Sequence, residues 1–424
     1  MRFKFYLNSL SVIIVAGLRV VVGFVIYKAV AKISGAEGVA LTGQINSVFS
    51  ITQLLATGAI ATGIVKYCSK YRDNLKEKNE YINTGFTLSV ICSGIIAVIF
   101  IFFKNFWAQK LHIPASESFI IYLLPIAAFL FAVNSILIAI INGSGYLKQY
   151  SFITLLNTII GILFAITVIY FFKIKGALIA IIFFQAIVVF QTVISIYIKQ
   201  PTFFKQLKWG INKTKLFNLL KFSAYAIVNI ITVNFTLILV RNFITQKLSL
   251  HDAGIWEGMT KISVGVISIY TMALGSYFFP FVANSTSKQS IVAALKKTFL
   301  LYCGSHILVC ILLYMCRISV TEILYSKDFG SMNKMYMLNL TGDVCRLAGW
   351  VIMNIFIAKN KLIVIIIYEV LFQFVFYISS LHLFFNNSLE SVSLAYCITY
   401  IFYLICTGII FLYFHFYKSN SLYE

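Results

Sequence analysis

Charged residues are scarce in this chain, and carboxylates are the scarcest of them. Only 11% of the 424 residues are charged, with 13 Asp and Glu against 34 Lys and Arg, and the chain has four prolines. This composition excludes a water-soluble protein, because 60% of the residues are hydrophobic and the mean hydropathy is +0.92. A helical span takes roughly 20 mostly apolar residues, so the chain can supply about 12 spans. We therefore expect an all-α polytopic membrane protein.

Metal-binding and catalytic patterns are also missing. The eight cysteines form no Cys-x-x-Cys pair, and the five histidines show no ligand spacing. Gly143-Ser144-Gly145 and Gly161 lack the spacing of a phosphate-cradling loop, and no connection exceeds about twenty residues, which leaves little room for an extramembrane catalytic domain. We expect small apolar packing roles for the cysteines, no metal or cofactor, and no enzymatic activity.

The net charge of +21 raises the alternative of nucleic-acid binding. The basic residues instead lie mainly in short connections between apolar runs, where membrane topology and anionic headgroups explain them. Counted together with the Lys and Arg at the adjoining span ends, the two termini and the even-numbered connections hold 20 of the 34 Lys and Arg, whereas the odd-numbered connections hold 10. We therefore expect both termini in the cytoplasm of a multi-pass protein of the bacterial inner membrane, with membrane lipids and no nucleic acid as partners.

Apolar runs divide the chain into twelve expected spans. They cover approximately residues 8–33, 40–66, 81–103, 118–142, 149–172, 176–198, 218–243, 254–281, 294–316, 335–357, 362–385 and 391–416. The longest connection, near 199–217, lies between the sixth and seventh spans, and weak matches relate the halves on either side. We expect two pseudo-symmetric six-helix lobes, 1–205 and 206–424, around a central cavity.

Ionisable residues inside spans are the candidate functional residues, because burying a charge in a bilayer is costly. Arg19 lies near the middle of the first run and is the strongest candidate. Lys28 follows nine residues later, which is half a turn away around a straight helix. A bend at Gly23 would bring both cations to a lumen, whereas a straight helix would leave Lys28 to extend toward the headgroups.

Two further cations, Lys66 and Arg241, lie at span ends, where they either extend to the headgroups or form a rim that attracts anions. In the eighth span Glu257 and Lys261 are four residues apart and can form an ion pair on one helix face.

In the tenth span Asp343 and Arg346 are three residues apart and can neutralise each other in the same way. Glu369 in the eleventh span has no obvious cation on its own helix. We expect the cations to bind a phosphate or pyrophosphate group, and Glu369, Asp343 and Glu257 are the candidates for coupling to protons or ions.

Several stretches together carry a resemblance to a known family. They are Arg19 with Lys28, Gly63-Ile64-Val65-Lys66-Tyr67, Gly254-Ile255-Trp256-Glu257-Gly258 with Ile262-Ser263, Gly342-Asp343-Val344, Ile357-Ala358-Lys359, and Tyr368-Glu369 with Phe372-Gln373. Over nearly its whole length the chain resembles Wzx-type flippases of O-antigen and other lipid-linked oligosaccharides, in the MOP exporter superfamily. The family has Lys in place of Arg19 and Arg346, which keeps the charge, and Gln in place of Glu257, which weakens the transfer of a role there.

The resemblance implies alternating access and movement of an undecaprenyl-pyrophosphate-linked oligosaccharide from the cytoplasmic to the periplasmic leaflet. It also implies a polysaccharide polymerase and a chain-length regulator as partners. Two alternatives remain open. One is a multidrug cation antiporter of the same fold, which would favour unpaired carboxylates in the first half. The other is a membrane glycosyl polymerase or ligase, which would be expected to have a large periplasmic loop.

Overall fold

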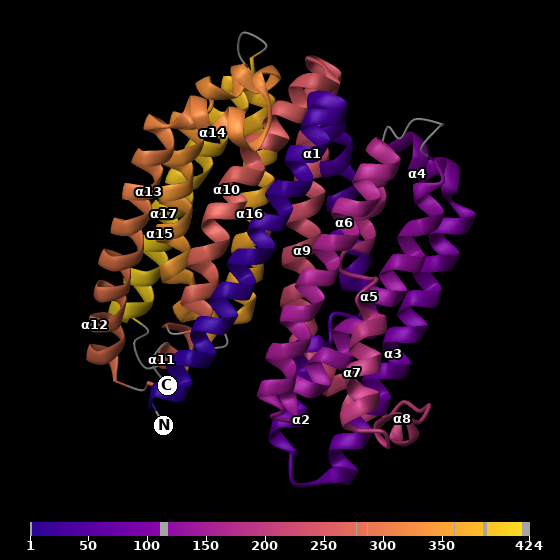
Figure 1. The fold of residues 1–424 in the computed structure, drawn as a ribbon. Coiled ribbons are helices and arrows are strands. Elements are labelled where there is room, and N and C mark those ends of the chain that lie inside the picture. The colour runs from indigo at the N-terminus through magenta and orange to yellow at the C-terminus, as the bar shows by residue number, and fades with distance from the viewer. Residues whose placement is uncertain are drawn as a thin grey trace. The chain divides into compact units, whose positions relative to one another are not determined.

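The computed structural model describes residues 2–110, 118–276, 278–285, 287–359, 361–384 and 388–417. Every regular element in these ranges is a helix, and ten helices are long and apolar enough to cross a membrane (Figure 1). The expected all-α polytopic fold is confirmed. The chain divides into two compact units, which are described separately: unit 1 is Met1–Ala40 with Thr236–Glu424, and unit 2 is Leu41–Phe235. Helices α1 (Arg2–Ala56) and α9 (Lys213–Lys247) each contain a boundary between units.

Unit 2 is organised around one central helix, α5, which packs against α2, α3, α6 and α7. Its own helices are α2 (Ala61–Lys70), α3 (Leu75–Phe102), α4 (Lys104–Lys110), α5 (Ile120–Gly143), α6 (Leu147–Phe183), α7 (Val189–Lys199) and α8 (Phe203–Gln206). Buried aliphatic residues of α2, α3 and α5, among them Ile64, Ile82 and Ile136, pack around Tyr81. Helix α3 begins at a polar cap, because the side-chain oxygen of Asn74 accepts a hydrogen bond from the Glu77 amide at 3.1 Å.

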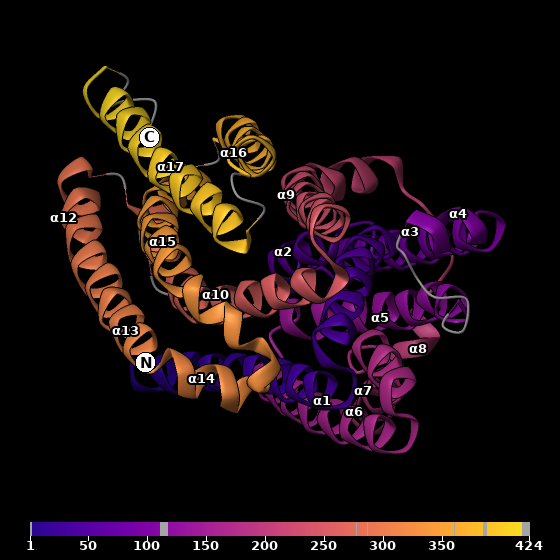
Figure 2. The same cartoon turned by 90° about the horizontal axis from the view of Figure 1, so that it is seen from above.

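Unit 1 is organised around α15, which packs against α10, α11, α13, α16 and α17. Figure 2 shows α15 among α10, α13 and α17. The helices are α10 (Leu250–Ser276), α11 (Phe278–Asn284), α12 (Lys288–Thr298), the π-helix η2 (Phe299–Cys303), α13 (Gly304–Met315), α14 (Arg317–Leu324), the 3-10 helix η3 (Lys327–Lys334), α15 (Tyr336–Ala358), α16 (Leu362–His382) and α17 (Leu389–Tyr417). Large apolar side chains of α13 such as Leu308 and Leu312 remain exposed, as a lipid-facing surface requires.

Two helices each contain more than one expected span. Helix α1 runs through the first expected span into the second, and its helical geometry breaks at Gly35 (φ 62°). Helix α6 runs from the fifth expected span into the sixth and breaks at Lys173 (φ 51°). Both breaks fall at connections that the sequence predicts between two spans. The helix assignment continues across each connection, but the backbone geometry at Gly35 and at Lys173 is not helical. The break in α1 lies at Gly35, and not at Gly23, where the sequence suggested a bend.

A close approach between α1 and α10 explains Gly254, one of the glycines in the stretch Gly254-Ile255-Trp256-Glu257-Gly258. A Cβ at Gly254 would overlap the main-chain carbonyl of Ala36. Only glycine therefore fits on α10 at this crossing, which fixes where the first turns of α10 meet α1 within unit 1.

The compact units are not the sequence halves expected from the longest connection. The units group residues by packing, whereas the lobes 1–205 and 206–424 rest on the repeat of six spans. The division into those two lobes therefore stays a prediction.

Candidate functional site

The first buried charge cluster of unit 1 centres on Glu257, which is fully buried on α10. Arg241 of α9 places its Nη2 at 2.5 Å and its Nε at 3.2 Å from Glu257 Oε2. The Lys261 ammonium lies 3.1 Å from Oε1, which is the same-helix ion pair that the sequence suggested. Tyr27 of α1 donates a 3.5 Å hydrogen bond to the same carboxylate. Two cations and one carboxylate leave this cluster with one net positive charge.

Aromatic rings flank both cations of this cluster. The Arg241 guanidinium lies 5.9 Å from the ring centroid of Trp256, and the Lys261 ammonium lies 5.3 Å from that of Tyr27. Arg241 is 2% exposed. Such rings add cation–π stabilisation to a buried ion pair, so the cluster holds its cations in fixed positions.

Lys28 contacts the end of α14. Its ammonium donates hydrogen bonds of 2.7 Å to the Glu322 carbonyl and 2.6 Å to the Tyr325 carbonyl, at the end of α14. A cation at a helix C-terminus satisfies carbonyls that lack partners within the helix. The Tyr325 hydroxyl in turn donates to the Gly258 carbonyl of α10 at 2.9 Å, and burial raises the pKa of this phenol well above its usual value. Lys28 thus joins the end of α14 to α1.

The second buried cluster of unit 1 connects α15, α16 and α17. The Tyr396 hydroxyl donates to Asp343 Oδ1 at 2.7 Å and accepts a 3.3 Å hydrogen bond from Arg346. The Arg346 guanidinium lies 5.1 Å from the ring centroid of Tyr400. Asp343 and Arg346 therefore meet through a tyrosine.

The tyrosines of α17 are residues that the sequence reasoning missed. Tyr400 and Tyr403 are buried and Tyr396 is half-buried, and the three follow a spacing of four and then three, which places them on one helix face. Neighbouring ring centroids lie 4.6 Å and 5.7 Å apart. Tyr368 of α16 donates a 2.6 Å hydrogen bond to the Tyr403 carbonyl. The available signal was this helical spacing of tyrosines inside an apolar run.

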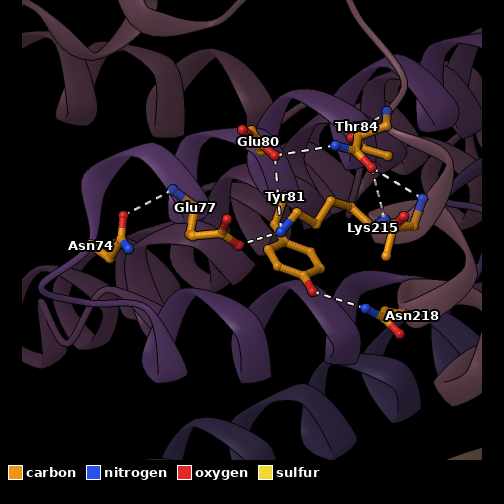
Figure 3. Close-up of polar contacts among 9 residues, drawn as sticks. Asn74, Glu77, Glu80, Tyr81, Thr84, Lys215 and Asn218 are labelled. Atoms are coloured by element: carbon orange, nitrogen blue, oxygen red, sulfur yellow. Dashed lines mark hydrogen bonds and ion pairs between the residues drawn. The ribbon is translucent and has the colours of Figure 1, made fainter.

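A third polar cluster, in unit 2, lies outside the spans. Lys215, near the start of α9, donates to Glu77 of α3 and lies 3.9 Å from Glu80 (Figure 3). The hydrogen bond from Lys215 to Glu77 raises the pKa of the lysine above its usual value. Its ammonium lies 4.9 Å from the Tyr81 ring centroid, and the Tyr81 hydroxyl accepts from Asn218 at 3.1 Å. This cluster fixes the start of α9 against α3.

The remaining predicted residues are not part of these clusters. Arg19 belongs to the helical backbone of α1, but its side chain lies outside the described residues. Lys66 is exposed on α2 in unit 2, where its ammonium lies 6.0 Å from the ring centroid of Tyr67. The structure thus brings Arg241, Lys261 and Glu257 together, and it connects Arg346 with Asp343 through Tyr396. Glu369 is half-buried on α16.

Comparisons with known proteins identify the family of this chain. The profile of the family described as polysaccharide biosynthesis protein matches residues 40–334. The lipid III flippases of Escherichia coli K12 and Shigella flexneri are each 22% identical over 394 residues, covering 92% of this chain and 94% of the relative.

Solved structures show the fold. An inward-facing multidrug resistance MATE transporter of the MOP superfamily matches with a TM-score of 0.71 at 11% identity, over 96% of this chain and 98% of that one. A MOP superfamily transporter from Pyrococcus furiosus, reported with a reverse polarity of its binding pocket, matches with a TM-score of 0.67 at 13% identity, over 98% and 96% of the two chains. The chain therefore has the helical fold of MOP superfamily transporters.

Proposed function

The chain belongs to the polysaccharide biosynthesis protein family, and from this premise we propose that it is a flippase for lipid-linked oligosaccharides. The cargo is an O-antigen-like repeat unit on undecaprenyl pyrophosphate, which moves from the cytoplasmic to the periplasmic leaflet of the inner membrane by alternating access. The protein acts as a transporter and not as an enzyme. A polysaccharide polymerase and a chain-length regulator are its proposed partners.

The observation that carries this proposal is the similarity to lipid III flippases along 92% of the chain. The buried clusters add physical support, because ionisable groups in membrane spans are costly and are retained where they act on a substrate or an ion. The similarity to multidrug transporters concerns the fold, and fold alone does not identify a cargo.

Three of the candidate cations belong to the two buried clusters of unit 1. Arg241 and Lys261 are held by Glu257, and their cluster keeps one net positive charge. Arg346 is held by Tyr396 and Tyr400. We propose that these cations, with Arg19, Lys28 and Lys66, act on the pyrophosphate along its route, because guanidinium and ammonium groups donate charge-assisted hydrogen bonds to phosphoryl oxygens.

Complementation tests the proposed cargo. Cells that lack their own O-antigen flippase should regain surface polysaccharide when they express this chain. Arg19→Ala should abolish the polysaccharide at a normal protein level, and Arg19→Lys should retain much of it, because the charge is kept. Drug resistance without restored polysaccharide would identify a multidrug antiporter, and polymerisation without translocation would identify a polymerase or ligase.

The proposed proton coupling rests on Glu369, Asp343 and Arg346, and Glu257 is the third candidate carboxylate. If Glu369 alternates between a protonated state and one paired with Arg346 during transport, Glu369→Gln fixes the neutral state. Turnover in vesicles should then stop while cargo binding persists. Translocation by Glu369→Gln at the parental rate, with an unchanged response to an imposed pH gradient, would remove this coupling scheme and leave the flippase proposal standing.

A further inference from the structure

A cavity of about 380 Å³ lies in unit 2, and none of the residues that line it is among those proposed for translocation. Three segments form it: the start of α3, the turn between α5 and α6, and the connection that follows α7. These belong to the second, fourth and sixth connections, all of which the charge pattern predicts to be cytoplasmic. Its polar lining includes Lys78, Asn79, Ser144, Lys199, Thr202 and Gln206.

Helix α3 divides its polar residues between two faces. Leu75, Lys78, Asn79 and Ile82 line the cavity, and their spacing of three, one and three puts them on one face. Glu77 and Glu80, one residue before Lys78 and one after Asn79, contact Lys215 in the cluster of Figure 3. The carboxylates nearest to the cavity along α3 are therefore held by another cation, and no Asp or Glu is among the described residues that line it.

The turn between α5 and α6 is closed by hydrogen bonds from its own amides. The amides of Gly145 and Tyr146 donate to the carbonyls of Asn142 and Ile141 at 3.1 Å and 3.2 Å, and this Schellman motif satisfies the end of α5. Gly145 has φ +82°, and a Cβ there would overlap the guanidinium of Arg72. At the start of α6 no side chain caps the first turn, and Tyr146, which precedes this helix, lines the cavity.

Ser144 supplies a buried hydroxyl that lacks a partner. The residue is 8% exposed and lines the cavity, and no described group accepts or donates a hydrogen bond at its Oγ. A buried hydroxyl is unfavourable without a hydrogen bond, so an acceptor oxygen in the cavity would stabilise it. Lys78 and Lys199 supply positive charge on two sides, from α3 and from the end of α7.

We propose that this cavity binds a phosphate group through Lys78, Lys199 and Ser144. Phosphoryl oxygens accept from ammonium groups and from hydroxyls, which are the donors that this cavity brings together. The phosphate comes either from the headgroup of an anionic lipid or from a soluble phosphorylated compound. A shallower hollow shares Tyr146, Lys199 and Gln200 and adds Lys148, so further phosphoryl or sugar groups have room beside the first.

The test uses the full chain in phosphatidylcholine nanodiscs, titrated with inorganic phosphate and followed by ³¹P NMR. Lys78→Gln and Lys199→Gln should each raise the dissociation constant about tenfold, since each removes one charge-assisted contact. Lys76→Gln is the matched control, because Lys76 is exposed on the same helix and does not line the cavity. Lys78→Arg should keep most of the affinity, which excludes misfolding as the cause.

The lipid source is tested in parallel by native mass spectrometry. The wild-type chain should retain phosphatidylglycerol more than phosphatidylcholine, and the double variant Lys78→Gln/Lys199→Gln should lose this preference. Binding in only one arm identifies the source of the phosphate. Saturable binding in neither arm, or equal losses in Lys76→Gln and Lys78→Gln, would overturn the proposal. Neither result would bear on the flippase proposal, which uses other residues.

Discussion

At the scale of single residues, the described charges inside the spans are positioned by partners from other helices. Glu257 is held by Arg241 of α9 as well as by Lys261 of its own helix. Arg346 and Asp343 are connected through Tyr396 of α17. Removal of one partner leaves a buried charge without compensation, which typically costs 3–5 kcal/mol. Loss of transport in a variant at these positions therefore needs a parallel measurement of protein level.

Lys215 gives a pH-dependent prediction outside the spans. Its pKa is raised by the hydrogen bond to Glu77, so the folded state holds this proton more tightly than the unfolded state. The resulting stability is fully present below the ordinary lysine pKa of 10.5 and is lost as the pH rises through the folded-state value. We expect Lys215→Met to lower Tm by about 1–2 °C at pH 8 and by less at pH 11.

The control for Lys215 is Lys213→Met, because Lys213 is exposed at the start of the same helix. Its Tm should equal that of the wild type at both pH values. An equal effect of Lys215→Met at pH 8 and pH 11 would show that packing of the alkyl chain, and not the ion pair, stabilises this contact.

At the scale of helices, hydrogen bonds from side chains decide where short helices end. Helix α14 has eight residues, which is too short to be stable alone in water. Its C-terminal carbonyls are satisfied by Lys28 of α1, while Tyr325 connects the same segment to α10. The position of α14 within unit 1 therefore depends on contacts with Lys28 of α1 and Gly258 of α10, which are both distant from α14 in the sequence.

Lys28→Ala tests this helix end. Loss of hydrogen bonds worth about 1 kcal/mol should speed amide hydrogen exchange in residues 317–325 about fivefold, as measured by mass spectrometry. Lys32→Ala should leave exchange unchanged, because Lys32 is exposed one turn further along α1. Normal exchange combined with lost surface polysaccharide in Lys28→Ala would instead support direct contact with the pyrophosphate.

At the scale of the whole molecule, the family and the fold are shown, whereas the orientation in the membrane rests on charge. Counted together with the adjoining span ends, the even-numbered connections and the termini hold 20 of the 34 Lys and Arg. Positive charge is retained on the cytoplasmic side of a membrane. The predicted orientation therefore uses only the distribution of charge along the chain and no tertiary contact, and it stays a prediction.

Accessibility labelling checks this orientation. Cysteines or reporter tags near Lys76, Lys208 and Lys361 should be cytoplasmic, and those near Glu117, Asp252 and Lys327 should be periplasmic. An external reagent that labels a cysteine at position 208 in intact cells would contradict the charge pattern. It would also place the proposed phosphate cavity on the periplasmic side.

The sequence by itself determined the all-α membrane fold, because long apolar runs can satisfy their backbone hydrogen bonds in a bilayer only as helices or closed barrels. It also determined the Glu257–Lys261 pair, since four residues bring two side chains together on any α-helix.

Only the tertiary structure decided the partners that come from other helices. Lys28 meets the Tyr325 carbonyl across 297 positions, and Tyr396 joins Asp343 across 53. The contacts of the α17 tyrosines with α15 and α16, and the cavity lined by Lys78, Ser144 and Lys199, also depend on residues from different helices. The local periodicity of the sequence predicts which face of a helix is polar. Which neighbouring helix packs against that face is decided by the tertiary structure.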